Sequence, residues 1–190
     1  MRFEHYINEE VVKIFKTEEE IDSLIKKNCK YYKSLGNFHF FRGIKQNSGG
    51  QFGENSVRQN RKSRGMTARS AKSVNKWLVK NGHTDRSKSM FAGSDPTRLY
   101  LFSQNIYEIF PIGKFNYTFI KVADINMFGK YDSEIRALKD YDMEGDPFNY
   151  LDNMNDIIIT NKNMKEAYDK KYEIWFDCKS YYYKYFSSYG

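Results

Sequence analysis

The chain has 190 residues, the size of a single domain, and 40% of them are hydrophobic. Aromatic residues alone make up 17% of the chain, which supports a packed core and excludes the composition of a disordered protein. The net charge is +7, and the sequence has no run of about 18 apolar residues, so we expect no membrane-spanning helix.

The start of the chain and its cysteines indicate a protein of a reducing compartment. The first residues, Met1 and Arg2 among them, lack the apolar region of a secretory signal. The two cysteines, Cys29 and Cys178, have neither the spacing of metal ligands nor that of a disulfide framework. We therefore expect two reduced, buried thiols in a cytosol or, alternatively, in a virus particle.

The first predicted element is a helix over about residues 18–34. Thr17 and Glu20 have the spacing of a capping box, and apolar residues then recur at helical intervals. Gly36 is a plausible stop signal. We interpret residues 1–35 as a helical N-terminal extension of one domain that spans the whole chain.

A short aromatic segment over residues 38–44 predicts a strand. The alternation of a strand would put Phe38, Phe40 and Arg42 on one face. Residues 46–65 contain several glycines and few apolar residues, which predicts a long loop. Long loops inside compact domains are usually functional or mobile.

The next predicted element is a second helix, which Thr67 can cap and which Asn81-Gly82 ends. Its apolar stripe consists of Ala71, Val74, Trp77 and Leu78. Apolar stretches separated by turns then predict six strands, over residues 88–92, 106–112, 114–122, 157–159, 172–176 and 181–186. A further helix is predicted over residues 131–141, and a further turn at Asp146-Pro147. Strands that follow a helical first half indicate an α+β fold.

Positive charge is concentrated between Lys45 and Lys88. This segment holds eleven lysines and arginines but only two acidic residues, a net charge of +9, so the rest of the chain sums to −2. A basic patch of this size fits a polyanionic partner, such as a nucleic acid, the phosphates of a dinucleotide or an acidic protein. The alternative is a solvated basic loop that has no ligand.

Three polar residues stand where a side chain could act on a ligand. Arg42 ends a strand directly before Gly43, so its guanidinium could bind two phosphate oxygens while the glycine lets a ligand approach the backbone. Ser94 lies in a turn of small residues, and Glu173 shares one face of an apolar strand with Trp175. The alternatives are a surface arginine in an ion pair, an ordinary turn serine and a solvent-facing glutamate.

Other catalytic patterns are missing from the sequence. The histidines His5, His39 and His83 form no constellation with a nucleophile or with further metal ligands, so we expect no metal site. There is no phosphate-binding loop and no dinucleotide fingerprint. The run Tyr181-Tyr182-Tyr183 predicts an amphipathic strand rather than a platform on which bases stack.

Taken in chain order, these pieces resemble the arginine-type ADP-ribosyltransferases. Phe40-Phe41-Arg42-Gly43 is similar to their aromatic-Arg-Gly strand, and residues 86–94 are similar to their strand that ends in a Ser/Thr-rich turn. Glu173 stands where their catalytic glutamate falls, after a loop over residues 160–171. A closer resemblance, over about residues 28–183, is to uncharacterised proteins of tailed bacteriophages, and its most specific piece is Ile109-Phe110-Pro111-Ile112-Gly113.

The resemblance implies a split, twisted pair of small sheets with flanking helices and with NAD in a cleft between the sheets. It implies a phage-encoded mono-ADP-ribosyltransferase that modifies a host protein or nucleic acid. By position, Arg42 would hold a phosphate of NAD, Ser94 would support the glutamate, and Glu173 would stabilise the oxocarbenium-like transition state as nicotinamide leaves. The remaining NAD-binding residues would be Gly43, Phe91 and Tyr107.

Two positions depart from the pattern of that family. The turn reads Gly93-Ser94-Asp95 where the family has Ser-Thr-Ser, and Lys171 replaces the acidic residue or Gln that helps to bind the acceptor. These departures favour an alternative, a non-catalytic phage protein that kept the fold as a virion or ejected component or as a nucleic-acid binder. Its partners would be nucleic acid or other virion proteins. For both hypotheses we expect a location in the host cytoplasm during infection or in the virion, with no membrane partner.

Overall fold

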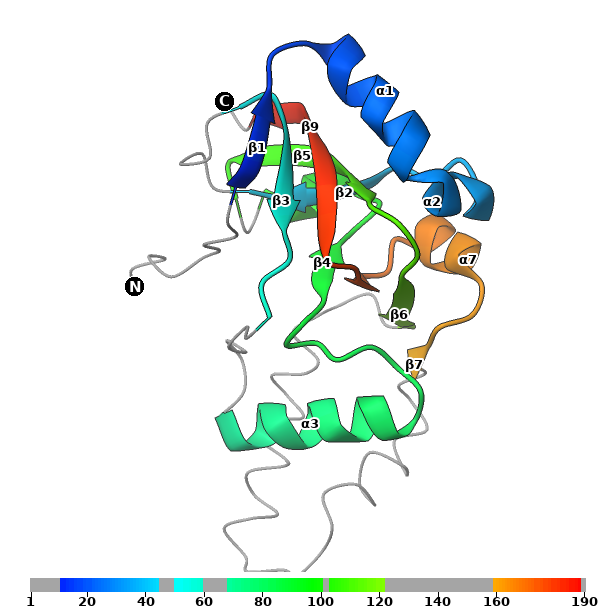
Figure 1. Ribbon diagram of the computed structural model, residues 1–190. Coiled ribbons are helices and arrows are strands. Elements are labelled where there is room, and N and C mark those ends of the chain that lie inside the picture. The colour runs from blue at the N-terminus through cyan, green and yellow to red at the C-terminus, as the bar shows by residue number, and fades with distance from the viewer. Residues whose placement is uncertain (1–10, 45–49, 60–67, 101–102, 122–158, 189–190) are drawn as a thin grey trace, which may run out of the picture.

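The computed structural model describes residues 11–44, 50–59, 68–100, 103–121 and 159–188. They form two antiparallel sheets with helices around them, which confirms the α+β class (Figure 1). The strand order is β1-β3-β9-β5-β2 in the first sheet and β4-β8-β6-β7 in the second sheet. Within the described ranges, no helix has the length and apolar character needed to cross a membrane.

The first sheet is built around a tyrosine-rich central strand. Its strands are β1 (Val11–Phe15), β2 (Phe40–Gly43), β3 (Phe52–Ser56), β5 (Asn105–Pro111) and β9 (Ser180–Ser188). Tyr181, Tyr182 and Tyr183 of β9 are all buried, because β3 and β5 flank the strand and both of its faces are covered. The predicted strand is therefore present, but here it is buried on both faces rather than amphipathic.

The second sheet is smaller and joins the first at its edge. Its strands are β4 (Met90–Ala92), β6 (Asn116–Ile120), β7 (Ile159–Thr160) and β8 (Ile174–Asp177). Phe41 of β2 exchanges two backbone hydrogen bonds with Gly93, which directly follows β4, at 2.7 and 3.0 Å. This bridge connects the last strand of one sheet to the first strand of the other.

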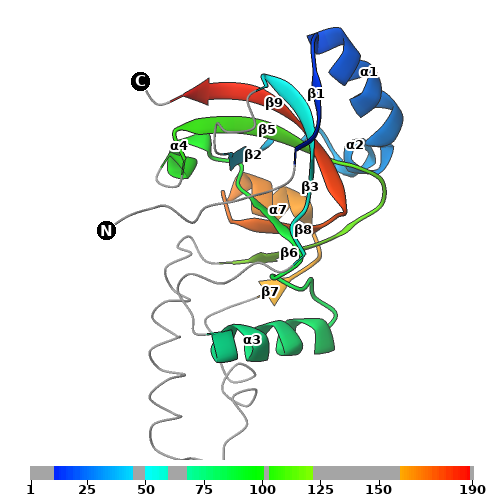
Figure 2. The same cartoon turned by 60° about the vertical axis from the view of Figure 1, so that its left-hand side comes forward.

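Helices lie around the sheets and at one end of them. They are α1 (Glu18–Asn28), α2 (Lys30–Leu35), α3 (Ala68–Lys80), α4 (Pro96–Leu99) and α7 (Met164–Asp169). α1 and α2 flank the first sheet, whereas α3 lies at the opposite end of the described structure, as Figure 2 also shows. The hydroxyl of Thr17 accepts the Glu20 amide at 3.2 Å, so the predicted cap of the first helix is confirmed.

Polar contacts fix α1 to the central strand of the first sheet. The apolar side of α1 buries Ile21 and Ile25. The Asn28 amide donates to the Tyr182 hydroxyl at 2.7 Å, and the Lys184 ammonium bonds Asp22 at 3.1 Å. The acidic first half of α1 therefore pairs with a lysine of β9.

The core between the sheets is mainly aromatic. The rings of Phe40 and Phe176, from the two different sheets, meet edge to face with centroids 5.5 Å apart. Both side chains are fully buried, as are Phe119 and Trp175 of the second sheet. Burying one such ring stabilises a fold by about 1.5–3 kcal/mol, so the aromatic composition accounts for much of the core.

Several predicted elements differ in the structure. The helix predicted over 18–34 is two helices, because the backbone leaves helical geometry at Cys29 before α2 begins. The segment 1–35 is not purely helical, since β1 pairs with β3 in the first sheet. The loop predicted over 46–65 contains β3, and the loop over 160–171 contains α7. The predicted helix over 131–141, the turn at 146–147 and residues 157–158 lie outside the described residues.

Both cysteines are free and buried, which confirms the expectation of buried thiols. Burial raises the pKa of the Cys29 thiol to about 12, against a partial lowering by Lys33. The Sγ atom of Cys29 also donates to the Phe110 carbonyl at 3.6 Å. A thiol in this environment is a small core residue rather than a nucleophile.

We predict that Gly53→Ala destabilises the fold by about 1–3 kcal/mol, the usual cost of overpacking a core. A Cβ atom at Gly53 would overlap the Tyr183 hydroxyl and lie 2.7 Å from the backbone oxygen of Lys13. The matched control is Gly93→Ala, whose Cβ would meet only Leu99 at 3.9 Å and should change stability by less than about 0.5 kcal/mol. Urea denaturation of the two variants measures the difference, and equal midpoints would show that Tyr183 does not require a glycine opposite it.

Candidate functional site

The bridge between the sheets gathers the three residues that the sequence singled out. Arg42 directly follows Phe41, and Ser94 directly follows Gly93, the two residues of the bridge. Ala92 of β4 is paired with Ile174 of β8 in antiparallel register, so Glu173, directly before β8, leaves the sheet at the same end. The structure thus places the backbones of Arg42, Ser94 and Glu173 at one junction, although 131 positions separate the first from the last. Each of the three side chains hydrogen-bonds to a different residue of the neighbouring elements.

Arg42 is buried at this junction rather than exposed. It is the third residue of β2, all four residues of which are buried, and its side chain is only 4% exposed. Its guanidinium donates to the carbonyl oxygen of Phe91 in β4 at 2.5 Å. The alternative of a surface arginine is therefore wrong, because this side chain adds a link between the two sheets.

Ser94 and Glu173 are each held by a neighbouring element. The Ser94 hydroxyl donates to the carbonyl of Tyr168 in α7 at 2.8 Å. The Glu173 carboxylate accepts a hydrogen bond from the indole Nε1 of Trp175 at 2.6 Å. This bond confirms that the two side chains lie on the same face, and it makes Glu173 a half-buried, anchored group instead of a solvent-facing one.

Arg86 is a further member of the site that the sequence did not single out. Its guanidinium lies over the rings of Trp175 and Phe91, with centroids at 4.9 and 5.4 Å, and these rings meet edge to face. Burial lowers the pKa of Arg86, and the nearby Glu173 carboxylate raises it in part. A positive charge, a carboxylate and two aromatic rings thus form one cluster at the end of β4 and β8.

From the sequence, Arg86 is one of the charges of the basic segment between Lys45 and Lys88. Little in the sequence indicates that it packs on Phe91 and Trp175 instead. The local signal is Asp85, whose carboxylate accepts from the amide and the hydroxyl of Ser87 at 2.8 and 2.7 Å. This Asx turn fixes the backbone around Arg86. Which way the arginine then points depends on Trp175, which is distant in sequence.

The other residues expected to bind NAD have structural contacts. A Cβ atom at Gly43 would lie 2.5 Å from the Cβ of Ser103, so the glycine makes room for that serine. Phe91 is half-buried beside Arg86. Tyr107 is opposite Arg42 in the β2–β5 register, is 4% exposed, and packs edge to face on Tyr183 at 5.2 Å.

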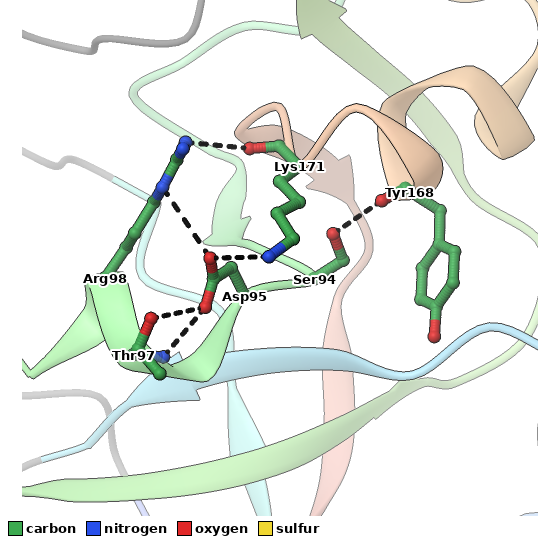
Figure 3. A network of polar contacts seen from close by, with 6 residues as sticks. All are labelled: Ser94, Asp95, Thr97, Arg98, Tyr168 and Lys171. Atoms are coloured by element: carbon green, nitrogen blue, oxygen red, sulfur yellow. Dashed lines mark hydrogen bonds and ion pairs between the residues drawn. The ribbon is translucent and has the colours of Figure 1, made fainter.

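The two positions that depart from the family pattern contact each other. The Lys171 ammonium lies 3.1 Å from Oδ2 of Asp95. Figure 3 draws this ion pair together with its neighbours. The other oxygen of Asp95 accepts from the amide and hydroxyl of Thr97 and so caps α4. Arg98 approaches the same carboxylate at 3.7 Å and donates to the backbone oxygen of Lys171 at 3.4 Å. We call the set of Asp95, Lys171 and Arg98 the clasp.

Comparison of the chain with protein-family models, curated proteins and solved structures found no match. Within the described part of the chain, no group of three or more His, Cys, Asp or Glu side chains is placed to hold a metal ion. The chemistry of the site must therefore be inferred from the junction itself.

We predict that Asp95→Asn lowers stability at neutral pH but not at low pH. The hydrogen bond from Thr97, and then Lys171, lower the pKa of Asp95 in spite of its burial. The charged form therefore contributes stability above the pKa of an unfolded aspartate, about 3.9, and this contribution is lost as the pH falls through the lowered folded value. Since Asn can still cap α4, the difference at pH 7 should be about 1 kcal/mol.

Urea denaturation of wild type and Asp95→Asn between pH 7 and acid pH measures this difference in unfolding free energy. The titration of the other carboxylates contributes equally to both proteins, so it cancels in the difference. A difference that stays constant over the whole range would show that the carboxylate charge of Asp95 contributes nothing.

Proposed function

We propose that the chain is an NAD-dependent mono-ADP-ribosyltransferase, encoded by a phage and acting on a host target. The observation that supports this proposal is that the backbone positions of Arg42, Ser94 and Glu173 are neighbours at the junction of two antiparallel sheets. The resemblance implied this order of residues and this pair of sheets. The Asp95–Lys171 contact adds support, because it gives both departures from the family pattern a structural role.

The residues at the junction fit a dinucleotide in their chemistry. Arg86 and Arg98 place two guanidinium groups beside β4 and α4, and guanidinium is well matched to phosphate oxygens, whereas the guanidinium of Arg42 already bonds the Phe91 carbonyl. Phe91 supplies a half-buried ring beside them. Glu173 supplies a carboxylate held in place before any substrate binds.

In the proposed reaction, the bond between the ribose C1′ and the nicotinamide nitrogen breaks, and nicotinamide leaves with the bonding electrons. An acceptor group then forms a bond to C1′ and releases a proton. Positive charge develops on the ribose in the transition state, and the Glu173 carboxylate would stabilise it and bond the 2′-hydroxyl. Because Trp175 already orients this carboxylate, little reorganisation is needed at the moment of reaction.

We predict that Glu173→Gln lowers transfer from radiolabelled NAD onto a bacterial lysate by about 100- to 1000-fold. The amide keeps the shape of the side chain and removes its charge, so the fold should survive and NAD should still raise the melting temperature. Glu19→Gln, at an exposed position of α1, is the control that removes one carboxylate far from the site. Absence of turnover by the wild type, or equal rates for wild type and Glu173→Gln, would contradict the enzyme proposal.

A second candidate function, nucleic-acid binding, is favoured by the surface of α3. Lys72, Lys76 and Lys80 are exposed and spaced four residues apart, so they follow one side of the helix. Between Asn55 and Thr84 the sequence has no acidic residue. α3 also lies at the end of the described structure away from the acidic first turn of α1 (Figures 1 and 2). Arg86 is not part of this surface, because it packs on Phe91 and Trp175.

We predict that changing Lys72, Lys76 and Lys80 together to Gln weakens binding to labelled DNA and flattens its salt dependence. Each lysine that neutralises a phosphate contributes about one unit to the slope of log K against log salt, so the triple variant should lose up to about three units. The control changes three exposed lysines of α1 and α2, Lys26, Lys27 and Lys30, and removes the same net charge. Fluorescence anisotropy from low to high salt provides the slopes.

Equal weakening by the two triple variants would indicate a general effect of net charge. No binding at low salt would leave α3 as a solvated helix without a nucleic-acid partner.

A further inference from the structure

The segment that carries Glu173 is held in an unusual backbone conformation. Lys171 has a φ of 58°, in the left-handed region that residues other than glycine rarely adopt. Its amide donates to the Tyr168 carbonyl at 3.2 Å, and the Tyr172 amide donates to the Ala167 carbonyl at 3.0 Å. The chain thus turns sharply at the end of α7 and reaches Glu173 two residues later.

Three contacts hold this turn from the side of β4 and α4. Ser94 bonds the Tyr168 carbonyl, Asp95 pairs with the Lys171 ammonium, and Arg98 bonds the Lys171 carbonyl (Figure 3). All three residues belong to the eight residues 92–99, which begin at the last residue of β4 and end with α4. The end of the strand that carries Phe91 is therefore tied to the turn that precedes Glu173.

Asp95 is the residue on which this arrangement converges. Its side chain is 13% exposed. One carboxylate oxygen accepts from Thr97 and caps α4, and the other contacts Lys171 and Arg98. Lys171 is 55% exposed along its side chain, so its ion pair with Asp95 contributes modestly to overall stability. The ion pair matters through its position, since it joins the segment 92–99 to the turn that precedes Glu173.

We propose that the Asp95–Lys171 ion pair is a positioning device that holds Glu173 in its hydrogen bond to Trp175. Asp95 and Lys171 act through the backbone between α7 and β8, and they are positioning residues rather than catalytic ones. The consequence for catalysis rests on the proposed transferase function, whereas the consequence for the geometry of Glu173 does not. The same pair explains why an aspartate and a lysine stand together at the two departing positions.

The test uses single and double variants with two independent readouts. Asp95→Asn keeps the cap of α4 and removes the charge, and Lys171→Gln removes the partner charge. The chain has two tryptophans, Trp77 and Trp175, so the substitution Trp77→Phe leaves Trp175 as the only one. Its fluorescence then reports on the contact with Glu173. The second readout is kcat and KM for NAD. The control is Lys165→Gln, which breaks the exposed Lys165–Asp169 pair on α7.

We expect each single variant to shift Trp175 emission toward that of Glu173→Ala, which has no acceptor for the Trp175 indole, and to lower kcat about 10- to 100-fold, with KM changed less than about threefold. The double variant should do no more than either single variant, because both remove one interaction. Lys171→Arg, which restores the charge, should recover most of the wild-type emission and kcat. Lys165→Gln should leave both unchanged.

Unchanged Trp175 emission in Asp95→Asn and Lys171→Gln, or additive effects in the double variant, would overturn the positioning proposal. If the wild type has no turnover but the emission changes are coupled as expected, the transferase proposal fails and the positioning role stands. The two proposals therefore fail on different measurements.

Discussion

The backbone bridge between Phe41 and Gly93 is the contact on which the geometry of this protein depends. Without it, β2 and β4 would be the edge strands of two separate sheets, with unpaired backbone groups. The bridge has only two hydrogen bonds, and Arg42 adds a third through the Phe91 carbonyl. Arg42 follows Phe41, Ser94 follows Gly93, and Glu173 precedes the strand paired with β4, so these three candidate residues lie beside this short connection.

The junction concentrates charge in a part of the molecule that is otherwise aromatic. Burying a guanidinium is unfavourable unless hydrogen bonds, opposite charges or aromatic faces compensate for the lost water. Arg42 has a backbone carbonyl, and Arg86 has two rings and the Glu173 carboxylate. A hydrophobic pair would fill the same space at a lower cost in solvation, so stability alone gives little reason for these charges. Under the proposed transferase function, these charges would also serve to bind a ligand that carries charge.

The parts of the fold that the sequence predicted correctly are those whose signals are local. Thr17 caps its helix, and the aromatic or β-branched segments around Phe40, Ile109, Phe119 and Trp175 are strands.

What the sequence missed depends on distant partners. β3 reads Phe-Gly-Glu-Asn-Ser, a composition typical of a loop, and it is a strand because the ring of Tyr183 lies against Gly53 and β9 supplies its hydrogen bonds. The order of Arg42, Ser94 and Glu173 could be read from the chain. The part that Arg86 plays could not, because Trp175 and Phe91 decide it.

The Asp95–Lys171 pair shows how a departure from a motif should be judged. In the sequence, each residue is a separate loss, and together they argue for an inactive relative of an enzyme family. In the structure the two side chains are 3.1 Å apart, and the turn they join leads directly to Glu173. The two departing side chains thus form one ion pair, and beside it the Glu173 carboxylate has its hydrogen bond to Trp175. Under the proposed function, the state of Glu173 is therefore the deciding question, because both departing residues lie next to the turn that carries it.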